Sequence, residues 1–288
     1  MIRPLYRDFT TQAQIDEQYN ASLRVTDPAA ELQHYRDAAA RARATLRHTL
    51  DIPFGPTREE TLDLFPADTP GAPVFVFIHG GYWRALSSKD FSGIALGLQP
   101  LGITAVVINY ALCPVVTLDE ITRQARAAVA WVLRRIDKHG GDPARIAIGG
   151  HSAGAHLTAM CLQTRWADDY GLPDDPLKAA VLVSGIYDID PLRYSYLQPI
   201  LQLDDGIIRR NSPMFGVRRC STPAWMTWGG AETSEFARQA QTYHAVWQAA
   251  GNHSELSPQP GANHYSAIHG LDDPSSALCQ WLAHVTRA

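Results

Sequence analysis

A buried strand that leads through a glycine-flanked serine directly into a helix constrains the fold of this chain more than any other stretch. Residues 146–148 (Ile-Ala-Ile) form a short β-branched run, residues 150–154 read Gly-His-Ser-Ala-Gly, and residues 153–162 carry an apolar helical pattern. A serine on so sharp a turn needs very small neighbours, because the backbone is strained there and packs closely on both sides. The free N–H groups at the start of the helix face any negative charge that develops beside the serine. The pattern therefore indicates that Ser152 is a nucleophile.

The rest of the chain alternates between strand and helix patterns, which is typical of an α/β fold. After two N-terminal helices, a Pro/Gly turn joins two strands that we expect to form an antiparallel hairpin at a sheet edge. Later strands are short apolar runs, as expected of a mostly parallel, twisted sheet with helices on both faces. We expect helices over residues 11–20, 27–48, 118–136, 153–162, 234–250 and 275–285, and strands over residues 48–52, 60–65, 74–78, 103–108, 146–148, 179–184, 224–228 and 255–258.

We expect one domain over residues 1–288, because no internal repeat, low-complexity tract or linker interrupts the chain. Residues 1–46 are then an N-terminal helical extension that lies over the core. Residues 186–216 form the one long irregular connection, and it is rich in aromatic and apolar side chains. A connection of this length is either a lid over a binding site or a pair of short packed helices.

Composition and charge exclude several classes of protein. Hydrophobic residues make up 45% of the chain and charged residues 19%, which is ordinary for a globular protein, and the net charge of −4 gives no reason to expect nucleic acid or an anionic membrane as partner. The four cysteines are far apart and show no C-x-x-C pair, so we expect no metal site and a reducing compartment. With neither an apolar leader nor a membrane-spanning run, the expectation is a cytoplasmic protein with a small-molecule partner. Whether it forms a homo-oligomer is left open.

Polar candidates follow the ends of the predicted strands, where ligands bind in an open parallel sheet. Residues 79–83 (His-Gly-Gly-Tyr-Trp) come directly after a buried strand. Two glycines let the backbone turn sharply there and present N–H groups to a ligand. We expect an oxyanion hole made by the N–H groups of Gly81 and Tyr82 together with that of Ala153, the residue after the serine.

The base should follow the last strand, and His264 lies in a glycine-containing loop just before the final helix. His269 is the alternative, although it falls in or near a helical segment. His79 is interpreted as a residue that orders the glycine turn. The side chains of His151 and His156 are expected to point away from the serine.

The acid should follow the strand over residues 224–228, because the order serine, acid, histidine is the one this topology uses. Glu232 lies on the loop there, 32 residues before His264, and a carboxylate at that point would hold the imidazole in the required tautomer. Glu235 lies at the start of the next helix, where its negative charge interacts favourably with the positive end of the helix dipole. Asp188, after the preceding strand, is the alternative acid.

Taken together, four motifs resemble the kynurenine formamidase (arylformamidase) branch of the α/β-hydrolases, close to the hormone-sensitive-lipase-like esterases. They are residues 79–83, 150–154, 230–236 and 263–265, and the N-terminal stretches 6–9 and 18–20 extend the likeness. The resemblance implies an α/β-hydrolase fold with a small cap or none, and hydrolysis of N-formyl-L-kynurenine. It implies that Ser152 and His264 are nucleophile and base. The matching acid is often Asp, whereas Glu232 stands here.

The mechanism expected from these residues is acyl transfer through an acyl-enzyme, without metal or organic cofactor. Tyr82, Trp83 and Tyr187 are expected to contact an apolar, flat substrate. A carboxylesterase for short acyl esters is the alternative within the same chemistry. A hydrolase-fold protein used only for binding is the alternative from another class, since fold does not fix function.

Overall fold

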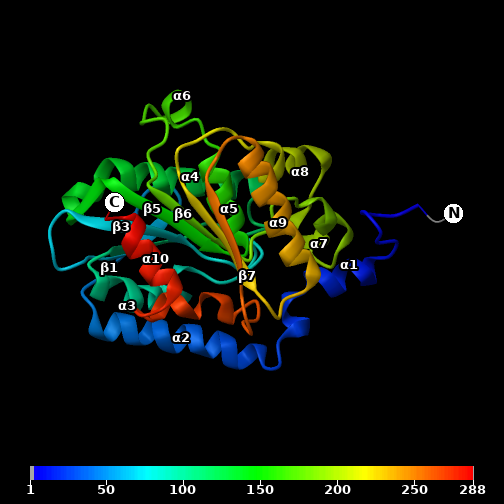
Figure 1. The fold of residues 1–288 in the computed structure, drawn as a ribbon, viewed down its shortest axis with the longest axis horizontal. Helices are drawn as coiled ribbons and strands as arrows, with labels where there is room; N and C mark the ends of the chain where they lie inside the picture. The colour runs from blue at the N-terminus through cyan, green and yellow to red at the C-terminus, as the bar shows by residue number, and fades with distance from the viewer. Residues whose placement is uncertain (1–2, 288) are drawn as a thin grey trace.

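An eight-stranded sheet forms the centre of the computed structural model, which describes residues 3–287 (Figure 1). The strand order is β1-β2-β4-β3-β5-β6-β7-β8; β1 and β2 pair antiparallel, β2 pairs antiparallel with β4, and all later pairs are parallel. The strands are β1 Thr49–Pro53, β2 Thr61–Phe65, β3 Ala72–Ile78, β4 Thr104–Ile108, β5 Gly141–His151, β6 Ala179–Val183, β7 Ala224–Gly229 and β8 Ser254–Gln259. The predicted antiparallel hairpin and mostly parallel sheet are confirmed.

The α-helices lie on both faces of this sheet, as expected (Figure 1). They are α1 Gln12–Tyr19, α2 Pro28–Thr45, α3 Ala95–Leu98, α4 Leu118–Arg135, α5 Ala153–Leu162, α6 Trp166–Tyr170, α7 Gln198–Leu201, α8 Asp205–Asn211, α9 Ser234–Ala249 and α10 Ala277–Val285. Short 3₁₀ helices occupy the connections: η1 Ala21–Arg24, η2 Ser88–Asp90, η3 Ser92–Ile94, η4 Gln99–Leu101, η5 Ile136–His139, η6 Asp190–Tyr194, η7 Pro213–Phe215 and η8 Ser266–Asp272.

Two hydrophobic cores, one on each face, explain why the central strands are apolar throughout. Val74, Val76 and Ile78 of β3 point into the core covered by α4, α5 and α9. Phe75 and Phe77 alternate with them and point into the core covered by α2, α3 and α10. Successive side chains of a strand face opposite sides of the sheet, so a strand covered on both sides must be apolar at every position.

The N-terminal extension begins with two capped helices. Thr11 caps α1, and the side chain of Gln14 in turn accepts the N–H of Thr11 at 3.2 Å, a reciprocal arrangement that satisfies N–H groups at a helix start. Asp27 caps α2 by accepting the N–H of Ala30 at 3.0 Å, and Pro28 occupies the first helical position. The extension therefore enters the fold as preformed helix, and α2 crosses beneath the sheet beside α3 and α10 (Figure 1).

Short helices make up most of two long connections, and for residues 186–216 packed short helices are one of the two structures that the sequence left open. Residues 84–102, for which we predicted no element, form η2, η3, α3 and η4. Residues 186–216 form η6, α7, α8 and η7, and they bury Leu192, Leu197 and Leu201 against the core on the α4 side. Helices of three to seven residues are too short to display a clear period of 3.6, so hydrophobic periodicity does not reveal them.

The turn between β5 and α5 places Ser152 at the end of the sheet in a strained conformation, with φ 56° and ψ −119°. Its N–H donates to the carbonyl of Val183 on the neighbouring strand at 2.8 Å. Gly154 packs so closely on the end of β3 that a Cβ atom there would lie 1.9 Å from the carbonyl oxygen of Ile78. The close approach requires glycine, which explains the small residues around the serine.

We predict that Gly154→Ala lowers the free energy of unfolding by about 3 kcal/mol or more, because the added methyl group forces β3 and α5 apart. Urea denaturation measures this. Gly102→Ala is the matched control: a Cβ there meets nothing within 4 Å, and only the positive φ of 76° opposes it, at a cost of about 1 kcal/mol. Equal losses in the two variants would contradict the packing argument.

Candidate active site

A cavity opens at the carboxyl ends of the parallel strands and brings the main candidate residues together. The empty space there is about 710 Å³, a figure that includes open solvent at the mouth. Ser152 from the end of β5, His264 from the loop after β8, and Gly81 and Tyr82 from the loop after β3 all line it. Three separate strand ends therefore converge on one cavity, as expected for an open parallel sheet.

His264 and Glu232 form a buried pair beside this cavity. Nδ1 of His264 donates to Oε2 of Glu232 at 2.6 Å, and both side chains are almost completely excluded from solvent. The other carboxylate oxygen, Oε1, accepts the hydroxyl of Ser184 at 2.5 Å and the N–H of Gly229 at 2.6 Å. With both oxygens engaged, the carboxylate has one orientation, and it fixes the tautomer of His264 with Nε2 free of the proton.

Asp188, the alternative acid, and Glu235, expected to interact with the helix dipole, are both engaged elsewhere. Glu235 accepts the hydroxyl of Tyr19 at 2.7 Å and forms an ion pair with Arg238, also at 2.7 Å. Asp188 accepts the hydroxyl of Tyr6 at 2.8 Å. Of the three carboxylates considered from the sequence, the structure brings Glu232 to the histidine.

The loop that carries His264 is held by its own side chains. The amide oxygen of Asn263 accepts the N–H groups of Tyr265 at 2.8 Å and Ser266 at 2.9 Å, which closes the turn before η8. The carbonyl of His264 accepts from Nε2 of His151 at 2.7 Å. The position of the imidazole is therefore fixed at the backbone as well as at Nδ1.

The N-terminal extension holds the same loop from outside. The hydroxyl of Tyr35 on α2 donates to the carbonyl of Tyr265 at 2.6 Å, and Glu31 on α2 accepts from Nδ2 of Asn263, also at 2.6 Å. The hydroxyls of Ser22 and Tyr265 lie 2.8 Å apart. Ser22 and Tyr35 also line the cavity, so the extension forms part of its wall. Local sequence patterns do not indicate this wall, because it rests on contacts between residues about 230 positions apart.

His151 differs from its expected placement. We expected its side chain to point away from the serine, but it lines the cavity and lies with its ring centroid 4.7 Å from that of His264. Burial, with a smaller contribution from neighbouring His264, holds the pKa of His151 well below its usual range. His151 is therefore neutral near pH 7, with Nε2–H directed at the carbonyl of His264.

The other histidines serve the packing. His79 stacks on Tyr110 with ring centroids 4.1 Å apart, and its Nδ1 donates to the carbonyl of Gly80 at 2.8 Å, so it braces the glycine turn. Nε2 of His156 donates to the carbonyl of Asn211 at 2.6 Å. Burial lowers the pKa of both His79 and His156 to about 4. His269, the alternative base, lies in η8 outside the cavity lining, where it stacks on His34 with centroids 3.8 Å apart.

The loop after β3 has an unusual backbone conformation. Gly81, Tyr82 and Trp83 have φ values of 111°, 50° and 56°, so two large residues adopt the left-handed region in succession. The carbonyl of Gly81 accepts the N–H of Arg84 at 3.0 Å, which closes the turn. The hydroxyl of Tyr82 donates to the carbonyl of Tyr19 and thus joins the turn to the N-terminal extension.

This backbone leaves N–H groups free to bind a ligand. Among residues 3–287, no acceptor receives the N–H groups of Gly81, Tyr82 or Ala153. The N–H of Ala153 belongs to the first residue of α5, where a helix leaves its donors unpaired. Free N–H groups beside a serine are what an oxyanion requires.

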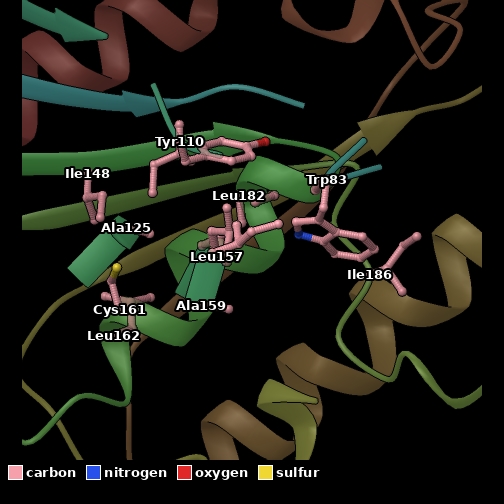
Figure 2. Close-up of a cluster of buried hydrophobic side chains, with 14 of the residues drawn as sticks. Trp83, Tyr110, Ala125, Ile148, Leu157, Ala159, Cys161, Leu162, Leu182 and Ile186 are labelled. Carbon is pink, nitrogen blue, oxygen red and sulfur yellow. The ribbon is translucent and has the colours of Figure 1, made fainter. Parts of the chain in front are cut away.

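Two of the three side chains expected to contact substrate lie in the core instead. Trp83 is fully buried, packs edge-on against His156 at 4.8 Å, and belongs to the cluster that contains Ile186 (Figure 2). Tyr187 is also fully buried and stacks on Tyr243 with centroids 4.2 Å apart. Neither lines the cavity, whereas Tyr82 does. The aromatic side chains that line it besides Tyr82 are Tyr35, Phe91, Tyr196 and Tyr265.

Two further findings concern metal sites and membranes. Among residues 3–287, no three His, Cys, Asp or Glu side chains are grouped so that they could hold a metal ion. Within the same residues, no helix has the length and apolar character needed to span a bilayer.

Comparisons with known proteins agree in the kind of protein they identify. A family model described as α/β hydrolase fold matches residues 75–268, which is more than half of the chain. The kynurenine formamidase of Danio rerio is 29% identical over 260 residues, covering 88% of this chain and 87% of that protein. Esterase LipQ of Mycobacterium tuberculosis is 30% identical over 75% of this chain and 56% of its own length.

Solved structures extend the likeness. A putative thioesterase from Silicibacter sp. tm1040 superposes with a TM-score of 0.82 at 27% identity, covering 94% of this chain and 97% of that one. An esterase of Pyrobaculum calidifontis superposes with a TM-score of 0.71 at 18% identity, covering 96% of this chain and 97% of that one. The latter likeness concerns the fold.

We predict that Tyr35→Phe lowers the free energy of unfolding by about 1 kcal/mol, because the carbonyl of Tyr265 loses its buried donor. Thermal or urea unfolding measures this. Tyr170→Phe is the control, since the hydroxyl of Tyr170 has no hydrogen-bond partner among the described residues; its loss should stay within about 0.5 kcal/mol. A Tyr35→Phe variant as stable as the control would show that the contact does not hold the loop.

Proposed function

Because this chain belongs to the α/β-hydrolase fold family, we propose that Ser152, His264 and Glu232 form a catalytic triad that hydrolyses aryl formamides through an acyl-enzyme. The chain is a hydrolase of the arylformamidase or esterase type, as its likeness to kynurenine formamidases and esterases establishes, and the predicted resemblance is thereby confirmed. The triad, the oxyanion donors and the formamide substrate are the proposal. The observation that carries it is the buried pair of His264 and Glu232 on the same cavity as Ser152.

The first half of the reaction forms the acyl-enzyme. Oγ of Ser152 attacks the formyl carbon while Nε2 of His264 takes its proton, and the carboxylate of Glu232 stabilises the imidazolium at Nδ1. The negative charge on the carbonyl oxygen is stabilised by the N–H groups of Gly81, Tyr82 and Ala153, each of which contributes about 3 kcal/mol in comparable sites. The C–N bond then breaks, and Nε2–H of His264 protonates the leaving aryl amine.

The second half repeats these steps with water. Nε2 of His264 takes a proton from a water molecule, whose oxygen attacks the formyl group on Ser152. The same N–H groups stabilise the second tetrahedral oxyanion. Collapse breaks the ester bond, returns the proton to Oγ of Ser152, and releases formate.

A flat aromatic substrate suits the cavity lining. Tyr35, Phe91, Tyr196 and Tyr265 line the same cavity as Ser152. Aromatic side chains pack favourably against an aryl ring. The relatives named kynurenine formamidase support N-formyl-L-kynurenine as the substrate, and those named esterase support short acyl esters as the second candidate.

The discriminating experiment compares kcat/KM for N-formyl-L-kynurenine with kcat/KM for 4-nitrophenyl acetate. We expect the formamide to be the better substrate. Ser152→Ala should lower kcat for both by a factor of about 10⁴ or more. A fluorophosphonate should label the native protein and not the variant. Ester turnover without detectable formamide turnover would favour the esterase, and neither turnover nor labelling would favour a binding protein.

We also predict that Glu232→Gln lowers kcat by a factor of about 10³–10⁴ with the fold intact, because the amide no longer stabilises the imidazolium or selects its tautomer. Circular dichroism checks the fold. Asp188→Asn is the matched variant and should lower kcat less than about tenfold, because Asp188 bonds Tyr6 rather than His264. The reverse order of effects would assign the acid to Asp188.

A further inference from the structure

One permanent charge faces the cavity, and the proposed mechanism does not use it. Arg84 is the single Lys, Arg, Asp or Glu side chain among the residues that line the cavity. It follows directly on the loop that carries the proposed oxyanion donors, and its N–H closes that loop by donating to the carbonyl of Gly81 at 3.0 Å. The residue is exposed, so its guanidinium meets solvent at the mouth.

The guanidinium has no acidic partner within the described chain. Among residues 3–287, no Asp or Glu forms a salt bridge with Arg84 at 4.0 Å or less. It stands over the ring of Tyr196, 5.8 Å from the centroid. Asp16, whose Oδ1 accepts the N–H of Tyr196 at 2.8 Å and whose Oδ2 accepts from Gln12 at 3.2 Å, forms no salt bridge with Arg84 either. Tyr196 thus orients a cation that remains available to an anion.

The place of Arg84 determines where such an anion would lie. In a turn closed by the N–H of Arg84 and the carbonyl of Gly81, the two Cα atoms are within about 7 Å of each other. Arg84 and Tyr196 both line the cavity, so the guanidinium that stands over the Tyr196 ring is held at the cavity, apart from an oxyanion bound at Gly81 and Tyr82. A guanidinium binds a carboxylate through two parallel N–H···O bonds.

We infer that Arg84 binds a carboxylate on the leaving-group side of the substrate and thereby selects acidic aryl formamides or aryl esters over neutral ones of equal size. The inference rests on the proposed hydrolase site. N-formyl-L-kynurenine has this character, because its carboxylate belongs to the leaving amine and is separated from the formyl group by the ring and the keto chain. 4-Nitrophenyl acetate has no such group.

The test uses a pair of substrates that differ only in charge: 4-(2-formamidophenyl)-4-oxobutanoate and its primary amide. We expect the native protein to prefer the carboxylate by about tenfold in kcat/KM, and high salt to reduce this preference. Arg84→Gln should bring the ratio close to one, and Arg84→Glu should invert it. Arg135→Gln makes the same charge change at the end of α4, next to η5 and the start of β5, and should keep the native ratio.

Three results would overturn the inference: a native ratio near one, a native-like ratio in Arg84→Gln, or an equal loss of both substrates in that variant. The last would mean that Arg84 supports the loop rather than the substrate. If the native protein hydrolyses neither formamide, 4-acetoxybenzoate with 4-acetoxybenzamide decides the role of Arg84 by the same ratios; the formamidase proposal fails if N-formyl-L-kynurenine is not hydrolysed either. If neither ester is hydrolysed, titration calorimetry measures the Kd of each ester for the native protein and for Arg84→Gln. The ratio of the two Kd values is then judged by the same criteria.

Discussion

The contact between Gly154 and the carbonyl of Ile78 is the constraint on which the rest of the site depends. It presses the turn after β5 against the end of β3, and the next residues after β3 are those of the loop that presents Gly81 and Tyr82. One close approach therefore sets the position of Ser152 and of the proposed oxyanion donors together. The positive φ angles of Ser152 and Tyr82 cost about 1–3 kcal/mol each, and packing in the cores on the two faces of the sheet helps to offset that strain.

The proposed base is positioned by distant parts of the chain in a comparable way. Glu232 from the end of β7 holds the imidazole of His264, and His151 of the serine turn holds its carbonyl. Tyr35 of α2 holds the residue that follows. The N-terminal extension is thus both a wall of the cavity and a support for the loop. A substrate bound there would contact the extension as well as the α/β core.

The elements with long apolar patterns could be predicted from the sequence, and α5 has the predicted bounds of residues 153–162. The candidate triad and glycine loop could also be placed, since each follows a recognisable strand. The direction of single side chains could not. Tyr82 and Trp83 are neighbours in a left-handed backbone, and one lines the cavity while the other is buried. His151 and Tyr187 show the same limit, because tertiary packing alone determines which way they face.

Strand order alone does not distinguish Glu232 from Asp188, because both residues follow strand ends that could reach the histidine. The hydrogen bonds of the two carboxylates do distinguish them. Glu232 lies in a turn in which its N–H donates to the carbonyl of Gly229 at 3.0 Å, while the N–H of Gly229 donates back to Oε1 at 2.6 Å. The Glu232 side chain therefore lies against its own turn, and its Oε2 accepts the hydrogen bond from His264. One carboxylate thereby bonds its own turn through Oε1 and the imidazole through Oε2. The turn that carries Glu232 therefore orients its carboxylate toward His264, whereas the carboxylate of Asp188 is bonded to Tyr6.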